Sequence, residues 1–131
     1  MGKKFLKQYE IFFKKAIVDL NSAKVILASF EKGDIELDIE VIFFHLQQSA
    51  EKLLKTFLDF HQIKFPRTHD LQILVNPLEE NEIKLDNSKE LLPLSIYALE
   101  GRYAILHDDL EDVNKYIEIL EDMINKVKER L

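Results

Sequence analysis

An arginine and a histidine, Arg102 and His107, lie five positions apart, shortly before the last stretch of helical sequence pattern. An imidazole can move a proton near neutral pH, and a guanidinium can hold the developing charge of a phosphorane through two parallel hydrogen bonds. Such a pair could cleave RNA without a metal, with the 2′-hydroxyl as the nucleophile. The spacing also arises by chance, and Asp108 or Asp109 could make this segment a helix start.

Four polar residues, Gln48, Glu51, Lys52 and Lys55, lie three or four positions apart. This spacing places them on one side of a helix. Read without further context, they form a solvated face with local ion pairs, each worth a few tenths of a kcal/mol.

The segment Pro66-Arg67-Thr68-His69-Asp70 interrupts the helical pattern. The residue before a proline avoids helical geometry, so the preceding helix ends here. Thr68 is the predicted N-cap of the next helix, and Asp70 favours the positive end of its dipole.

The sequence lacks the usual metal-binding and phosphate-binding patterns. It has no cysteine, and none of its four histidines is spaced i, i+4 from another, as in a helical zinc motif. It also has no glycine-rich phosphate loop and no nucleophile elbow. We therefore predict no metal site and no cofactor.

Composition favours one small helical domain over residues 1–131. Of these 131 residues, 47% are hydrophobic and 32% are charged, with three glycines and three prolines. The net charge of −6 argues against non-specific binding to nucleic acid or to anionic membranes. No apolar run reaches the ~18–20 residues that span a bilayer, and no signal peptide is evident. We expect a cytoplasmic protein without membrane contact.

The candidate residues named above can act together only if helices bring them to the same place. Apolar residues recur at helical spacing along five segments, and the fourth contains Pro93, which either kinks that helix or marks its start. The pattern predicts an all-α bundle of four to five helices with antiparallel neighbours, and it leaves room for a dimer seam. The predicted helices run from about Lys4 to Phe30, Asp38 to His61, His69 to Glu79, Ser88 to Tyr103 and Leu110 to Leu131.

Taken together, the motifs resemble those of HEPN domains. The run from Phe44 to Lys55 is similar to their second helix, with its Gln-x-x-Glu-Lys-x-x-Lys pattern. The segment from Pro66 to Leu71 is similar to a Pro-Arg-Thr-His-Asp-Leu segment of the family, and the Arg-x4-His motif lies where the family has its own. The resemblance covers nearly the whole chain.

The resemblance implies an up-and-down helical bundle that dimerises. Many HEPN proteins are metal-independent ribonucleases, often toxins of toxin–antitoxin pairs beside a minimal nucleotidyltransferase antitoxin. In such a protein, Arg102 and His107 are the catalytic pair at a composite cleft between two protomers. The residues implied in nucleotide or RNA binding are Gln48, Glu51, Lys52, Lys55, Arg67, His69 and Tyr103.

The motif also departs from the ribonuclease pattern. Tyr103 stands where catalytic members have asparagine, and Asp109 stands where the antitoxin-modified branch has tyrosine. Arg102-Tyr103 resembles a further branch that lacks the catalytic histidine. Two alternatives therefore stay open: a non-catalytic module that binds a nucleotide or docks a nucleotidyltransferase, and a helical interaction domain without a ligand.

Overall fold

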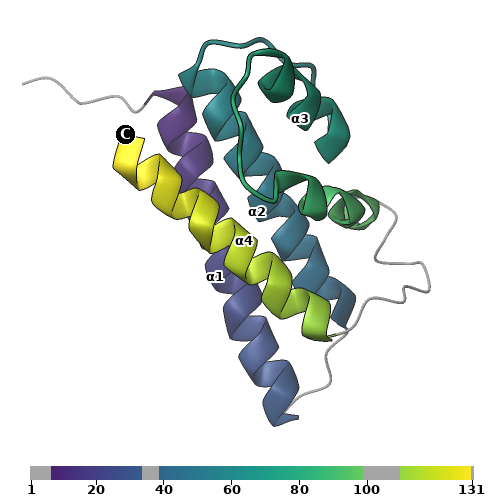
Figure 1. Ribbon diagram of the computed structural model, residues 1–131. Coiled ribbons are helices and arrows are strands. Elements are labelled where there is room, and N and C mark those ends of the chain that lie inside the picture. The colour runs from purple at the N-terminus through teal and green to yellow at the C-terminus, as the bar shows by residue number, and fades with distance from the viewer. Residues whose placement is uncertain (1–6, 34–38, 99–109, 131) are drawn as a thin grey trace, which may run out of the picture.

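The computed structural model describes residues 7–33, 39–98 and 110–130, and all regular secondary structure in these ranges is helical. Three long α-helices, α1 (Gln8–Lys32), α2 (Ile39–Phe60) and α4 (Leu110–Arg130), form the body of the molecule (Figure 1). Between α2 and α4 the chain forms a short helix α3 (Leu71–Glu80) and a 3₁₀ helix η1 (Ser88–Tyr97). The predicted all-α, up-and-down bundle of four to five helices is confirmed.

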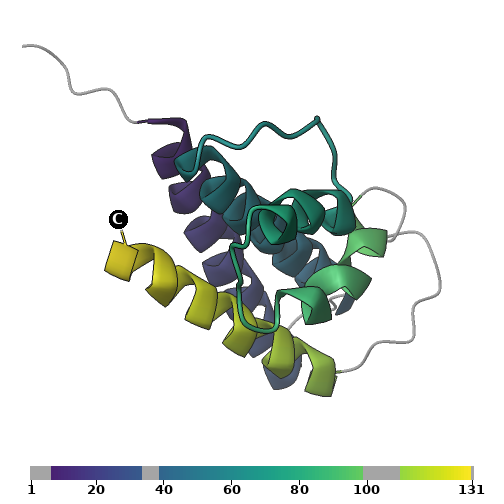
Figure 2. The same cartoon turned by 45° about the horizontal axis from the view of Figure 1, so that its top comes forward.

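Helix α2 lies at the centre of the bundle because it packs against each of the other four helices. Its most extensive partner is the antiparallel α1, and α4 runs along this pair with its C-terminal end near the start of α1 (Figure 1). Helices α3 and η1 pack on α2 and on each other, away from α1 (Figure 2). The polar residues of α2 can therefore reach both neighbouring layers.

The core is continuous and apolar, and α2 supplies more of its fully buried residues than any other described helix. Residues that recur at helical spacing point inward from α1 and α4, as the sequence pattern predicted. None of the described helices combines the length and the apolar character needed to cross a membrane. The fully buried core residues of α2 are Ile42, Phe43, Leu46, Ala50, Leu53, Leu54 and Leu58.

Helix α1 ends at Lys32, two residues beyond the predicted end at about Phe30, and Gly33 follows it as the C-cap. Gly33 adopts a left-handed conformation (φ 68°), and its N–H donates to the carbonyls of Ser29 and Phe30. Glycine adopts this conformation without steric cost, which is why it often follows the last helical residue.

The predicted N-cap of α3 is wrong. The cap is Asp70, whose side chain accepts a hydrogen bond from the Gln72 N–H at 3.0 Å. Thr68 instead accepts one from the Asp70 N–H at 3.0 Å, which fixes the turn that leads into the helix. Thr68 and Asp70 both have short polar side chains that can cap a helix, and their spacing alone does not show which one is the cap.

The predicted helix that begins at Ser88 is present, but over its described part it is a 3₁₀ helix, and it ends at Tyr97. Its buried residues, Ser88, Leu91, Leu94 and Tyr97, recur at every third position. Three residues per turn is the period of a 3₁₀ helix, so this repeat keeps one row of side chains against the core. Tyr97 completes the contact by stacking on Phe43, with ring centroids 4.8 Å apart.

Candidate functional site

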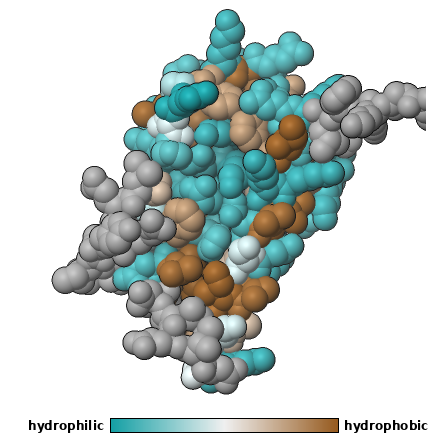
Figure 3. Space-filling view, turned by 180° about the vertical axis from the view of Figure 1, so that it is seen from behind, coloured by the Kyte–Doolittle hydropathy of each residue, from teal (hydrophilic) through white to brown (hydrophobic). Residues whose placement is uncertain are grey.

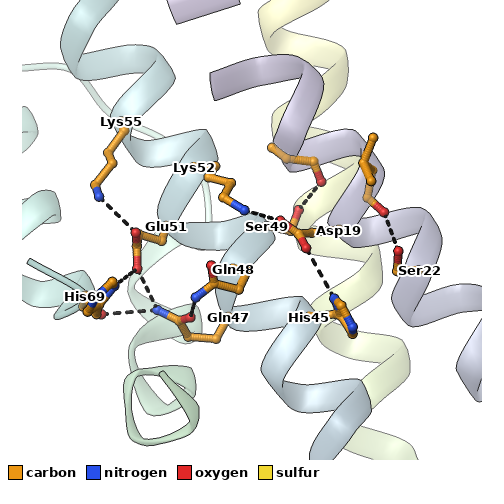
Figure 4. Close-up of polar contacts among 12 residues, drawn as sticks. Asp19, Ser22, His45, Gln47, Gln48, Ser49, Glu51, Lys52, Lys55 and His69 are labelled. Atoms are coloured by element: carbon orange, nitrogen blue, oxygen red, sulfur yellow. Dashed lines mark hydrogen bonds and ion pairs between the residues drawn. The ribbon is translucent and has the colours of Figure 1, made fainter. Parts of the chain in front are cut away.

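The predicted polar face of α2 is not a solvated surface. It divides into two networks that hold α2 to its neighbours on opposite sides (Figure 4). Glu51 and Lys55 belong to the network toward α3, whereas Lys52 belongs to the network toward α1.

The first network centres on the carboxylate of Glu51, whose side chain is only 5% exposed. Its Oε1 accepts hydrogen bonds from Nε2 of Gln47 at 3.1 Å and from Nδ1 of His69 at 2.8 Å. Its Oε2 accepts one from Nζ of Lys55 at 2.8 Å. Gln48 extends the network by donating to the side-chain oxygen of Gln47 at 2.7 Å. A buried carboxylate needs this number of donors to remain ionised.

The pKa of Glu51 reflects two opposing influences. Burial by itself raises it, because the charged form loses its hydration. The hydrogen bonds from Lys55, His69 and Gln47, together with the Lys55 charge, outweigh burial, and the pKa lies below its ordinary value. Glu51 is therefore a fixed negative charge at neutral pH.

The network orients the ring of His69, which comes from the turn before α3. An ionised carboxylate only accepts hydrogen bonds, so Nδ1 of His69 carries the proton in the Glu51 contact. Nε2 is then the nitrogen that can exchange a proton or contact a ligand, and the side chain is half exposed. Gln47 also donates to the backbone carbonyl of His69 at 3.2 Å, which fixes the residue at both ends.

The second network joins α2 to α1 through Asp19. Its two carboxylate oxygens accept from Nζ of Lys52 at 2.5 Å and contact Nδ1 of His45 at 3.2 Å. Ser49 adds a hydrogen bond to the Ala16 carbonyl at 2.8 Å. The charge of Lys52 is thus matched inside the protein, so this predicted ligand-binding residue lies in a contact between helices.

A pocket of about 670 Å³ lies beside the first network, where the start of α1 meets the end of α2. It brings together two predicted site residues, Lys55 and Arg67. The other residues that give the pocket its chemical character are Lys64, Asp59, Phe12 and Phe65. The two phenylalanine rings lie with their centroids 6.3 Å apart and form an apolar part of the wall.

Sequence reasoning missed four residues of this region. Lys64 and Phe65 follow α2 directly, and a basic residue beside an aromatic one, before Pro66-Arg67, was a local signal. Asp59 and Phe12 carry no such signal, because helix pairing alone brings them to the pocket.

The remaining predicted residues lie elsewhere. Arg102, Tyr103 and His107 fall outside the described residues. Within the described ranges, no group of three histidine or acidic side chains comes together as metal ligands do.

Comparisons with known proteins place this geometry in a family. The family model for the HEPN domain matches residues 9–130. The crystal structure of an archaeal HEPN homologue matches with a TM-score of 0.61 and 25% sequence identity, over 95% of this chain and 98% of that chain. A search of curated proteins found no match. The family match covers both polar networks and, apart from Gln8, all of the helices and the pocket lining, and the chain belongs to the HEPN family.

Proposed function

We propose that the protein binds the phosphate group of a nucleotide, either free or within single-stranded RNA, in the pocket between α1 and α2. The observation that carries this proposal is the meeting of cationic and aromatic side chains in one concave site. The site is within the ~300–1,000 Å³ range of small-molecule pockets.

The cations of the pocket suit a phosphate. Arg67 and Lys64 are exposed, and neither forms an ion pair with another residue in the described part of the chain. Arginine can hold a phosphate through two parallel hydrogen bonds. Lys55 is already paired with Glu51, so it adds a donor but little net charge. The remaining anion, Asp59, leaves the pocket with a local positive balance in an acidic protein.

The aromatic wall suits a base. Phe12 and Phe65 are partly buried, so part of each ring stays available at the wall of the pocket. Stacking of a base on an aromatic side chain contributes ~1–3 kcal/mol and tolerates any base. Asp59 adds an acceptor for an amino group or a ribose hydroxyl.

The test measures binding of a fluorescein-labelled single-stranded oligoribonucleotide by anisotropy and of AMP by calorimetry. We expect the double substitution Lys64→Gln, Arg67→Gln to weaken RNA binding at least tenfold and to flatten its salt dependence, because two phosphate contacts are lost. Phe65→Leu should weaken binding about fivefold or more through lost stacking. Binding of RNA without binding of AMP would identify the polymer as the ligand.

Lys32→Gln is the matched control, because Lys32 is exposed at the other end of α1 and far from the pocket. Unfolding curves must show that all variants are folded, since Phe65 packs partly against the core. The proposal fails if the wild type binds neither probe, or if the pocket variants bind as the Lys32→Gln protein does.

A second candidate function is metal-independent cleavage of RNA, which the intact Arg102-x4-His107 motif favours. In it, His107 takes the proton of the 2′-hydroxyl or returns one to the leaving oxygen, and Arg102 stabilises the phosphorane. Tyr103, next to the arginine, is the candidate for contact with the base.

The test of cleavage uses mixed RNA with EDTA present. We expect the wild type to give products ending in 2′,3′-cyclic phosphate, and His107→Ala to lose at least a hundredfold in rate. Equal activity of the two proteins contradicts the candidate. If neither cleaves, pocket binding stands alone, and co-purification with a minimal nucleotidyltransferase tests a docking role.

A further inference from the structure

Asp59 is the one acidic residue among the described residues that line the pocket between α1 and α2. It lies in the last turn of α2, and its side chain is partly buried. Lys55, one turn earlier, is paired with Glu51 instead. Asp59 forms no ion pair within the described ranges, although Lys64 and Arg67 line the same pocket. Its carboxylate is therefore available to a ligand.

The charges of the pocket fix the direction in which a nucleotide enters. Lys64 and Arg67 attract a phosphate, whereas the carboxylate of Asp59 repels it. The phosphate therefore lies at the two cations, and the base is left to meet Asp59. Because the pocket is positive on balance, it disfavours a cationic ligand. The groups that donate to Asp59 are then neutral N–H or O–H groups.

The surface around the end of α2 suits a flat apolar body with a polar edge. Seen from behind, the upper end of the molecule, where α2 ends, has apolar and hydrophilic side chains next to one another (Figure 3). The rings of Phe12 and Phe65 are tilted by 57° to each other, so a base that stacks on one ring meets the other at an angle. The polar edge of that base can then reach Asp59.

We propose that this pocket selects guanine, with the two carboxylate oxygens of Asp59 accepting hydrogen bonds from N1–H and from the 2-amino group. The inference rests on the proposed function, the binding of a nucleotide in the same pocket. Guanine has two N–H donors side by side on its Watson–Crick edge. An ionised carboxylate only accepts, and its two oxygens can accept in parallel.

The other bases do not match Asp59 in this way. Adenine and cytosine each place one amino donor next to a ring nitrogen that accepts, and uracil has one N–H between two carbonyls. An acceptor that faces a carboxylate is repelled, which turns the contact into a penalty. Gln8 and Gln62 also line the pocket, but an amide can turn either its oxygen or its nitrogen to a ligand. Discrimination between bases therefore falls to Asp59.

Calorimetry with five nucleoside monophosphates measures the selection. We expect GMP to bind at least tenfold more tightly than AMP, CMP or UMP, because those three lose hydrogen bonds to a charged group. IMP keeps N1–H and lacks the 2-amino group, so its affinity should lie between those of GMP and AMP.

The substitution Asp59→Asn should change which base is preferred. Its amide oxygen still accepts from N1–H, whereas its amide nitrogen donates to the O2 that replaces the 2-amino group in xanthine. We expect GMP to bind at least tenfold more weakly than to the wild type, and XMP at least tenfold more tightly. Asp122→Asn makes the same chemical change at an exposed position on α4 and should leave both affinities unchanged. A purely structural role of Asp59 does not create binding of XMP.

Two results overturn the selection of guanine and leave the proposed function standing. One is binding of GMP, AMP, CMP and UMP within threefold of one another. The other is an Asp59→Asn protein that keeps the preference for GMP or gains no affinity for XMP. If RNA binds and no mononucleotide does, oligouridylates with one central guanine or adenine replace the mononucleotides, and equal affinity for the two overturns the inference. Failure to bind either RNA or any nucleotide contradicts the proposed function itself.

Discussion

The buried carboxylate of Glu51 organises the region beside the pocket. It holds His69 and Lys55 at fixed positions, although its own oxygens are too deeply buried to meet a ligand. A ligand in the pocket meets Lys55, and a ligand near the turn before α3 meets the half-exposed ring of His69. Glu51 is thus a positioning residue for both.

The lowered pKa of Glu51 makes stability depend on pH. Because the folded pKa lies below the ordinary value of 4.5, this carboxylate stabilises the fold above about pH 4.5. That contribution is lost as the pH falls through the folded pKa. We expect Glu51→Gln to lower the free energy of unfolding at pH 7 by roughly 1.5–3 kcal/mol, the cost of losing hydrogen bonds to a charged group.

Urea unfolding at several pH values measures this effect. The difference between wild type and Glu51→Gln should shrink as the pH falls below about 4.5, because Glu51 of the unfolded wild type takes up a proton there, and it disappears once the folded carboxylate is protonated too. Glu118→Gln, at an exposed position on α4, serves as the control and should change stability little at any pH. An effect of Glu51→Gln that stays constant down to pH 3 contradicts the assignment of an ionised, stabilising carboxylate.

Individual residues of the site could be predicted to different degrees. Glu51, Lys55 and His69 belong to recognisable patterns, yet the predicted solvated face was wrong because spacing within α2 does not reveal which neighbours cover it. Asp19 was missed although it is a charged residue close to the inner stripe of α1. A charge at such a position indicates a partner on another helix.

At the level of elements, η1 shows how a period can be misread. Four buried positions separated by three residues fit a 3₁₀ helix better than an α-helix, whose period is 3.6. Pro93 contributes by removing a backbone donor. Both signals are present in the sequence. The segment was nevertheless predicted as an ordinary helix, because long 3₁₀ helices are uncommon.

Helices α2 and α3 end in the same way. Gln62 and Glu82 adopt left-handed conformations with φ of 58° and 59°. The N–H of the following residue, Ile63 or Ile83, donates to a carbonyl five residues before it at 2.9 Å. Both isoleucines pack against the core, which completes a Schellman motif at each end.

Glycine should be preferred at such a position. We expect Glu82→Gly to raise the free energy of unfolding by up to about 1 kcal/mol, because a left-handed conformation costs a residue with a side chain ~1–2 kcal/mol and part of this gain is lost to chain entropy. Glu80→Gly, two residues earlier and still helical, should lower it by up to about 1 kcal/mol.

Thermal unfolding of the two variants checks this prediction, since the same chemical change is made two residues apart. Opposite signs identify backbone conformation as the cause. If both variants are destabilised, the strain at Glu82 is negligible.

On the scale of the whole molecule, the number and order of the helices could be predicted because each long segment is amphipathic over several turns. The site could be predicted only in part, because it is made where segments distant in sequence meet. Phe12 and Phe65 are 53 positions apart, and only the pairing of α1 with the end of α2 brings them together.

The net charge of the whole molecule likewise does not reveal how its charges are distributed. A net charge of −6 argues against non-specific binding of nucleic acid, yet Lys64 and Arg67 are grouped beside one pocket. Local arrangement, which needs the fold, decides what an acidic protein can bind.

The position of α4 has a consequence for synthesis on the ribosome. Helix α4 is made after all the other helices, although it packs on α2 and lies with Val127 and Lys128 beside the start of α1. The apolar faces that α4 covers therefore remain open while the hairpin of α1 and α2 waits outside the exit tunnel. During this interval the nascent chain exposes apolar surface of α1 and α2, and docking of α4 ends that exposure.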